Sequence, residues 1–220
     1  VITFSLEHSS VLIPAYHLQQ RYGVTVRVVE LKFDDTAEAI ISKVAQAVTK
    51  NTRLVFCSHI QYTCGLRMPV EEIRDLTAPK GIKMLLDGAQ TGGHISLDLT
   101  SLGCEFYSIP GQKWLMGPDG IGALYIRKDV IPDIKPFRVS GRAVTTYDQN
   151  GGYEPNDDSI DKFLLTTNSA PLAAGFTTAI RLHENIGSNA VENRVIELSS
   201  LLKESLSSIQ GVTLASPRDR

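Results

Sequence analysis

Short apolar runs alternate with amphipathic runs along the first 127 residues. Two of the apolar runs, Arg53–Ser58 and Lys83–Asp87, show no alternation of apolar and polar residues, which is typical of strands buried on both faces of a mostly parallel sheet. We therefore expect strands at Ile2–Leu6, Thr25–Leu31, Arg53–Ser58, Lys83–Asp87, Phe106–Ile109 and Gly122–Arg127.

Several of the segments between these strands have the apolar periodicity of a helix. Apolar residues recur with a period of 3.6 between Ala37 and Val48, and Pro69 is suited to the first turn of a further helix that Gly81 would end. This alternation of strands and helices predicts the α/β class.

The pattern changes after Phe137. Residues 138–162 are polar and rich in turn residues, and two helices are expected after them. The second of these helices is expected from Asn189 to Ile209, and a strand-like run, Val212 to Ala215, follows it. The first has Leu172, Phe176, Ile180 and His183 on one side.

Composition excludes several classes of protein. A formal net charge of -2 offers no basic face for nucleic acid, and no apolar run is long enough to span a membrane. The three cysteines are odd in number and lack metal-ligand spacing, which argues for reduced thiols in the cytoplasm and against a disulfide framework or a metal site. The chain begins without methionine, directly in a predicted strand, so we expect an internal piece of a longer protein.

Polar groups gather where the predicted strands end. They are Glu7-His8, Ser58-His59, the Asp87-Gly-Ala-Gln90 segment and the Gly111-Gln-Lys-Trp114 segment. Ligands of open α/β sheets bind beyond the carboxyl ends of the strands, so we expect a site there. A nucleotide-binding protein would need a glycine-rich turn after the first strand, and His8-Ser9-Ser10 is not one.

Asp87 and Lys113 indicate one particular chemistry when they are taken together. Alone, Asp87 reads equally well as a turn or capping residue, and Lys113 as a solvated lysine. A carboxylate at the end of an apolar strand needs a cationic partner, for which a protonated pyridine nitrogen is one candidate. A lysine in a glycine-rich loop can form a Schiff base, and His8 supplies a flat neighbour. These are the parts of a pyridoxal 5'-phosphate (PLP) site.

The ordered set of motifs resembles the class V aminotransferases, the cysteine desulfurase-like branch of the fold type I PLP enzymes. The resemblance runs from residue 1 to about residue 215, and the DGAQ segment followed by the lysine loop is its most specific part. It implies a three-layer α/β/α large domain with a mostly parallel sheet over residues 1–185. Residues 186–220 would begin a small C-terminal α+β domain.

The resemblance also implies roles for individual residues. Lys113 matches the Schiff-base lysine, Asp87 the partner of the pyridine nitrogen, and His8 the histidine that stacks on the ring. Gln90 matches the residue that hydrogen-bonds the phenolic oxygen of the cofactor. Thr167 resembles a threonine that reaches the phosphate of the neighbouring subunit, which implies a homodimer.

Three positions depart from the pattern of the desulfurases. Pro110 stands where they usually carry the serine that would hold the phosphate. Gln112 stands where they usually carry histidine, although its amide can still donate to the phosphate. Tyr62 stands where they usually carry asparagine, and this aromatic version is closer to C–S lyase and epimerase-like members.

The function that the resemblance implies is a PLP-dependent reaction on an amino-acid substrate. Cysteine desulfuration or cysteine/cystine C–S lysis through Lys113 is expected, with a sulfur-acceptor protein as a candidate partner. The alternatives are a class V aminotransferase, an amino-acid epimerase, or a relative that has lost its catalytic activity.

Overall fold

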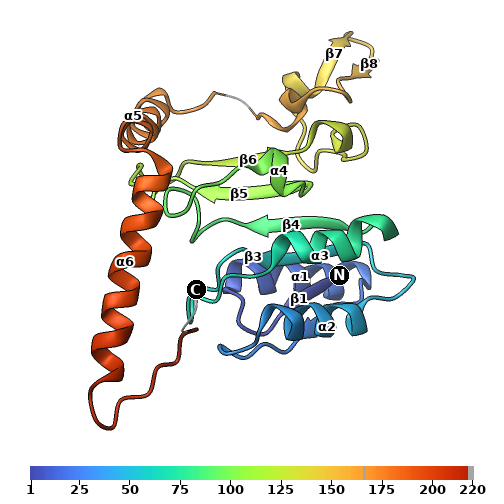
Figure 1. Cartoon of the computed structure of the whole chain (residues 1–220). Helices are drawn as coiled ribbons and strands as arrows, with labels where there is room; N and C mark the ends of the chain where they lie inside the picture. Colours follow the sequence, from blue (N-terminus) through green and yellow to red (C-terminus); the bar gives the residue numbers. More distant parts are fainter. Residues whose placement is uncertain (166, 218–220) are drawn as a thin grey trace.

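The computed structural model describes residues 1–165 and 167–217. Its centre is a six-stranded sheet with the order β2-β1-β3-β4-β5-β6 (Figure 1). Every neighbouring pair is parallel except β5 and β6, so the predicted mostly parallel α/β sheet is confirmed. The strands are β1 (Ile2–Phe4), β2 (Arg27–Val29), β3 (Leu54–Ser58), β4 (Lys83–Asp87), β5 (Phe106–Pro110) and β6 (Gly122–Ile126).

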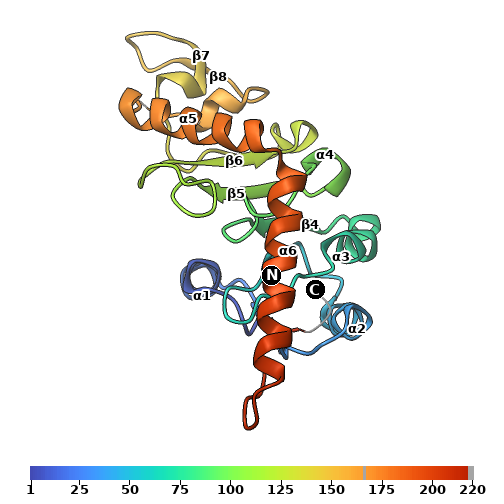
Figure 2. The ribbon, with the colours of Figure 1, turned by 60° about the vertical axis from the view of Figure 1, so that its left-hand side comes forward.

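Helices cover both faces of this sheet. Figure 2 shows α1 on one side of it and α2 and α3 on the other. The helices are α1 (Ser9–Tyr22), α2 (Ala37–Ala47), α3 (Val70–Thr77), α4 (Leu99–Leu102), α5 (Ala170–Ile186) and α6 (Ser188–Ser207). This is the three-layer arrangement that the resemblance implied.

The main hydrophobic core lies on one face of the central strands. Val55 in β3 and Leu86 in β4 are fully buried there. The opposite face, which carries Phe56 and Asp87, is only partly buried. These strands are apolar without alternation, yet part of their second face, at Phe56 and Asp87, lines a cavity.

Helix α1 was not predicted from the periodicity. Only Val11 and Ala15 are buried among its residues, and Pro14 lies inside it, so the sequence carries no wide apolar stripe. The helix is instead defined at its ends. His8 caps its N-terminus, and Gly23 ends it in the left-handed conformation.

Beyond β6 the chain leaves the sheet. The turn-rich region contains a two-stranded hairpin of β7 (Val144–Tyr147) and β8 (Tyr153–Pro155). The boundary expected between residues 185 and 186 falls at the end of α5, next to Gly187 between the two long helices. The strand-like run Val212 to Ala215 is not a strand, because no described strand pairs with it.

Helix α6 stands beside the sheet, on the side toward which β4 runs (Figure 1). None of its residues is buried, and Leu198 and Leu202 are 47% and 59% exposed. Its Glu192 carboxylate accepts hydrogen bonds from Arg67 Nη1 at 3.2 Å and from Ser96 N at 3.0 Å. Among the described helices, none is both long and apolar enough to cross a membrane.

Candidate active site

A cavity of about 570 Å³ opens where strands β4 and β5 end and helix α1 begins. It collects side chains from segments that lie far apart in the sequence, including four of the predicted site residues. Its lining is His8, Ser10, Phe56, Asp87, Ala89, Ser108, Ile109, Pro110, Gln112, Lys113, Gly122, Ala123 and Leu124.

Asp87 is the last residue of β4, between two serines of the neighbouring strands. The register aligns it with Ser58 of β3 and Ser108 of β5. One of its carboxylate oxygens, Oδ1, accepts a hydrogen bond of 2.9 Å from Ala89 N. The turn after the strand therefore fixes the carboxylate at the edge of the cavity.

Lys113 lies in the connection between β5 and β6, which we call the lysine loop (residues 111–121). The loop is closed at its base by a hydrogen bond of 2.8 Å from Gly111 N to Ile121 O. Lys113 O accepts from Met116 N at 2.9 Å, so the lysine begins a tight turn. Its side chain is exposed and lines the same cavity as Asp87.

His8 caps the N-terminus of helix α1 and also lines the cavity. Its Nδ1 accepts a hydrogen bond of 3.1 Å from Ser10 N, and the Ser10 hydroxyl lies 2.8 Å from the same nitrogen. In the neutral ring the proton is therefore on Nε2. The edge of Tyr62 also meets this ring, with centroids 4.9 Å apart and planes at 84°. These contacts fix the plane of the imidazole.

The remaining predicted residues are placed differently. Gln112 lines the cavity beside Lys113. Gln90 does not line it, and its Oε1 accepts a hydrogen bond of 2.9 Å from Trp114 Nε1. Thr167 is exposed in the segment before α5 and is not part of the lining. The structure thus brings His8, Asp87, Gln112 and Lys113 together in one cavity. Gln90 is linked to the lysine loop by its hydrogen bond with Trp114. Thr167 lies outside the cavity lining.

A buried carboxylate behind the cavity joins β1 to β3. Both oxygens of Glu7 lie 3.0 Å from Ser58 N, and Glu7 also accepts from Ser58 Oγ at 2.5 Å and from Gln61 Nε2 at 2.8 Å. Burial raises the pKa of this carboxyl above its usual value, against the effect of these donors. The sequence indicated the Glu-His pair but gave no sign of these partners.

His59 belongs to a second buried network. Its Nδ1 lies 2.9 Å from Tyr107 Oη, which lies 2.5 Å from Thr91 Oγ1. Burial lowers the pKa of His59 to about 4 and raises that of Tyr107 well above its usual value. Both groups are therefore neutral at physiological pH, and His59 is a hydrogen-bonded structural histidine.

Helix α5 supports the lysine loop from outside the sheet. A side-chain carbon added at Gly111 or Gly117 would come within 3.2 Å of the Phe176 ring. The His183 ring lies with Nε2 2.8 Å from Trp114 O, and the carbonyl can only accept, so His183 carries its proton on Nε2. Periodicity had placed Phe176 and His183 on one side of a helix without indicating what that side contacts.

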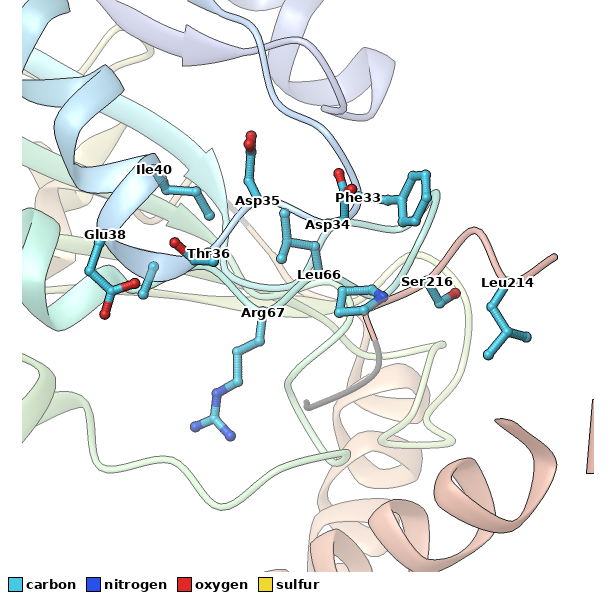
Figure 3. Close-up of a pocket in the computed structure, with 12 residues that line it drawn as sticks. Phe33, Asp34, Asp35, Thr36, Glu38, Ile40, Leu66, Arg67, Leu214 and Ser216 are labelled. Atoms are coloured by element: carbon cyan, nitrogen blue, oxygen red, sulfur yellow. The ribbon is translucent and has the colours of Figure 1, made fainter. Parts of the chain in front are cut away.

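A second cavity, of about 550 Å³, lies between residues 33–38 and the C-terminal segment (Figure 3). Two of its charged side chains form ion pairs. Asp35 pairs with Lys43, and Arg67 pairs with Glu192. None of the predicted site residues lines it, so the candidate active site is the cavity that holds Lys113 and Asp87.

The lining of the first cavity suits a flat, charged pyridine cofactor. It offers an imidazole face, a carboxylate and a primary amine, together with hydroxyl and amide donors from Ser10, Ser108 and Gln112. Among residues 1–165 and 167–217, no group of three or more His, Cys, Asp or Glu side chains is arranged to hold a metal ion.

Comparison with known proteins adds independent evidence. The model of the family "Aminotransferase class-V" matches residues 1–220. A probable cysteine desulfurase of Halalkalibacterium halodurans is 30% identical over 221 residues, which cover 100% of this chain and 53% of that protein. The chain therefore spans about half the length of the curated relatives it matches.

Solved structures show the same likeness. The cystine C–S lyase C-DES in complex with its product cysteine persulfide has a TM-score of 0.85 and 27% identity, over 99% of this chain and 59% of that one. A C-DES variant with glycine covalently linked to its PLP cofactor has a TM-score of 0.84 and 26% identity, over 99% and 58%. With the family model matched along the whole chain, this protein belongs to the class V aminotransferase family.

Proposed function

We propose that the full-length protein is a PLP-dependent enzyme that releases sulfur from cysteine or cystine, as a desulfurase or a C–S lyase. The observation that carries this proposal is the single cavity lined by His8, Asp87 and Lys113. An amine, a carboxylate and a flat ring at the carboxyl edge of an α/β sheet are what PLP chemistry requires. The names of the relatives favour sulfur chemistry over transamination or epimerisation.

Lys113, Asp87 and His8 would each have a separate role toward the cofactor. When bound, PLP supplies a ring that accepts the electrons released as the substrate loses a proton. The Lys113 amine would hold the cofactor, and as a free amine it would serve as the base that takes the proton from the α-carbon of the substrate. The Asp87 carboxylate would keep the pyridine nitrogen protonated, and the His8 ring would orient the cofactor.

Further parts of the proposal concern the whole protein. Gln112 donates to the cofactor phosphate, and Thr167 donates to the phosphate of the neighbouring subunit in a homodimer. In a desulfuration, a thiolate of a sulfur-acceptor protein would attack the sulfur of the substrate cysteine and become a persulfide. The carbon–sulfur bond would break with its electron pair left on the carbon, which would take up a proton to give alanine. The described cysteines, Cys57, Cys64 and Cys104, are all free, which supports a reducing, cytoplasmic location.

The test uses the purified full-length protein. It is expected to show a visible absorbance band from the bound cofactor and to turn over cysteine or cystine. Alanine as product identifies a desulfurase, while pyruvate and ammonia identify a lyase. Replacing Lys113 with alanine should abolish the band and lower turnover by roughly 10²–10⁴-fold or more, because the covalent attachment and the base are both lost.

The matched control is Lys135→Ala, which removes an exposed lysine outside the cavity and should leave both the band and the turnover unchanged. Retention of the band and of turnover in Lys113→Ala would contradict the assignment of this lysine. A full-length protein that takes up PLP but acts on neither cysteine nor cystine would instead support one of the alternative activities, or a relative without activity.

A further inference from the structure

Trp114 connects the lysine loop to the turn that follows Asp87. It is the residue after Lys113, and its indole Nε1 donates to Gln90 Oε1 at 2.9 Å. It is also the only tryptophan among the 220 residues. The residue is 45% exposed, so burial alone does not account for its position.

Trp114 is held both at its ring and at its backbone. The His94 ring stacks on it with centroids 4.1 Å apart and planes at 17°, and Trp114 O accepts from His183 Nε2 at 2.8 Å. His94 in turn donates from Nδ1 to Gln90 O at 2.8 Å. Gln90 is therefore contacted both at its backbone, by His94, and at its side chain, by Trp114.

This arrangement selects one orientation of the Gln90 amide. An indole N–H can only donate a hydrogen bond. It can therefore pair with the amide oxygen of Gln90 but not with the amide nitrogen. With Oε1 used by Trp114, the NH₂ group is the part of Gln90 that remains to serve as a donor. If the Gln90 amide were rotated by half a turn, its NH₂ group would face the indole N–H, and the hydrogen bond between the two side chains would be lost.

We propose that Trp114 is a positioning residue that holds the Gln90 amide with its NH₂ group toward an anionic oxygen of the bound cofactor. The inference rests on the proposed function, because it requires PLP in the cavity beside Gln90. Trp114 acts through Gln90 and does not itself touch the cofactor. It thereby ties the position of the lysine loop to a donor that stabilises the phenolate oxygen of the ring.

The test is Trp114→Phe in the full-length protein, because phenylalanine keeps a ring to stack on His94 and removes only the N–H. We expect the pH midpoint of the visible cofactor band to shift upward, since the phenolate oxygen loses a well-oriented donor. We also expect the affinity for PLP, measured by reconstitution of the apoenzyme, to fall about 3- to 10-fold, the range for one hydrogen bond.

A double-mutant cycle separates positioning from packing. Gln90→Leu should cause a loss of similar size, and adding Trp114→Phe to it should change neither the midpoint nor the affinity further. Equal effects of Trp114→Phe in the two backgrounds would overturn the inference. Tyr147→Phe, which removes a hydroxyl from an exposed ring on the β7–β8 hairpin, should behave as wild type.

Gln90→Glu provides a second test that keeps the acceptor for Trp114 Nε1. A carboxylate has no NH₂ group to offer, so the pH midpoint should rise at least as far as in Trp114→Phe, and an unchanged midpoint would overturn the inference. If the wild-type protein takes up no PLP, the proposed function fails and this inference fails with it. If wild type takes up PLP and Trp114→Phe matches it in midpoint and affinity, only the inference is lost.

Discussion

Two buried ionisable side chains behind the cavity respond to pH in opposite directions. Burial raises the pKa of Glu7, so the folded state binds its proton more readily than the unfolded state does. Its contribution to stability therefore falls as the pH rises above the usual carboxyl value. Burial lowers the pKa of His59, so its contribution falls as the pH drops. In both groups the largest cause of the pKa shift is burial, which disfavours the charged form.

His59 gives the sharper prediction. Its pKa is about 4 in the folded protein and 6.5 ordinarily, so between these values the unfolded state binds a proton that the folded state does not. Stability is fully present above pH 6.5 and is lost as the pH falls toward 4. On going from pH 7 to pH 5, the loss from this one residue should be about 2 kcal/mol.

Urea unfolding of the full-length protein at these two pH values measures this loss. His59→Asn places an uncharged amide near Tyr107 and should remove about that much of the pH dependence, whatever its effect on stability at pH 7. His17→Asn changes an exposed histidine of α1 and should leave the pH dependence as it is in wild type. An identical pH dependence in His59→Asn and wild type would contradict the assignment.

The lysine loop owes its shape to the elements packed against it. Gly93, in the turn region after β4, has φ of +81°, and a side-chain carbon there would lie 2.8 Å from the backbone of Trp114 and Leu115. Phe176 of α5 contacts the loop from another direction. A loop that carries a reacting amine benefits from such support, because small displacements of a catalytic group are costly to its function.

Gly93→Ala tests this support. Any residue with a side chain loses about 1–2 kcal/mol at a left-handed position, and at Gly93 the added methyl also pushes against the lysine loop. Gly23→Ala is the matched control, because Gly23 has φ of +67° and no neighbour within 4 Å of the added carbon. Urea unfolding should show a larger loss of stability for Gly93→Ala than for Gly23→Ala. Of the two variants, only Gly93→Ala should bind PLP more weakly than wild type. Equal losses with unchanged PLP affinity would show that the contact does not matter.

For the molecule as a whole, the position of Thr167 bears on the proposed homodimer. Thr167 is exposed and lies outside the cavity lining of its own chain, which is where a residue that serves a neighbouring subunit would be found. Helix α6 also presents exposed leucines, in a chain that spans about half the length of its relatives. A complete site would then require residues from more than this one segment.

Subunit complementation tests the role of Thr167 across the dimer. Thr167→Ala should weaken PLP binding of the full-length dimer about 3- to 10-fold by loss of one hydrogen bond. In a mixed dimer of a Thr167→Ala subunit and a Lys113→Ala subunit, one site combines an intact lysine with an intact threonine. That dimer should bind PLP at one site with wild-type affinity. Binding only with the weakened affinity would mean that Thr167 serves its own subunit, and a monomeric protein would contradict the proposal altogether.

Much of the architecture could be predicted from short-range patterns. Asp87 ends β4 as expected, because an apolar run followed by Asp-Gly marks both a strand and its end. The Pro- and Gly-bounded lysine loop was likewise recognisable. Helix α1 was not, because a helix that buries only Val11 and Ala15 leaves almost no periodic signal. The run Val212 to Ala215 has strand composition but no partner strand, and a strand exists only as part of a sheet.

The sequence by itself determined which chemical groups stand at the ends of the strands, since local propensity and residue order are properties of neighbouring residues. Only the tertiary structure decided which of those groups meet. Glu7 is hydrogen-bonded to Ser58, 51 positions away in the sequence, and Trp114 to Gln90, 24 positions away. Such pairs depend on strand order and on how the helices and loops pack, and no local pattern encodes them. The chemistry was therefore visible in the sequence, while the contacts that orient it became visible only in the fold.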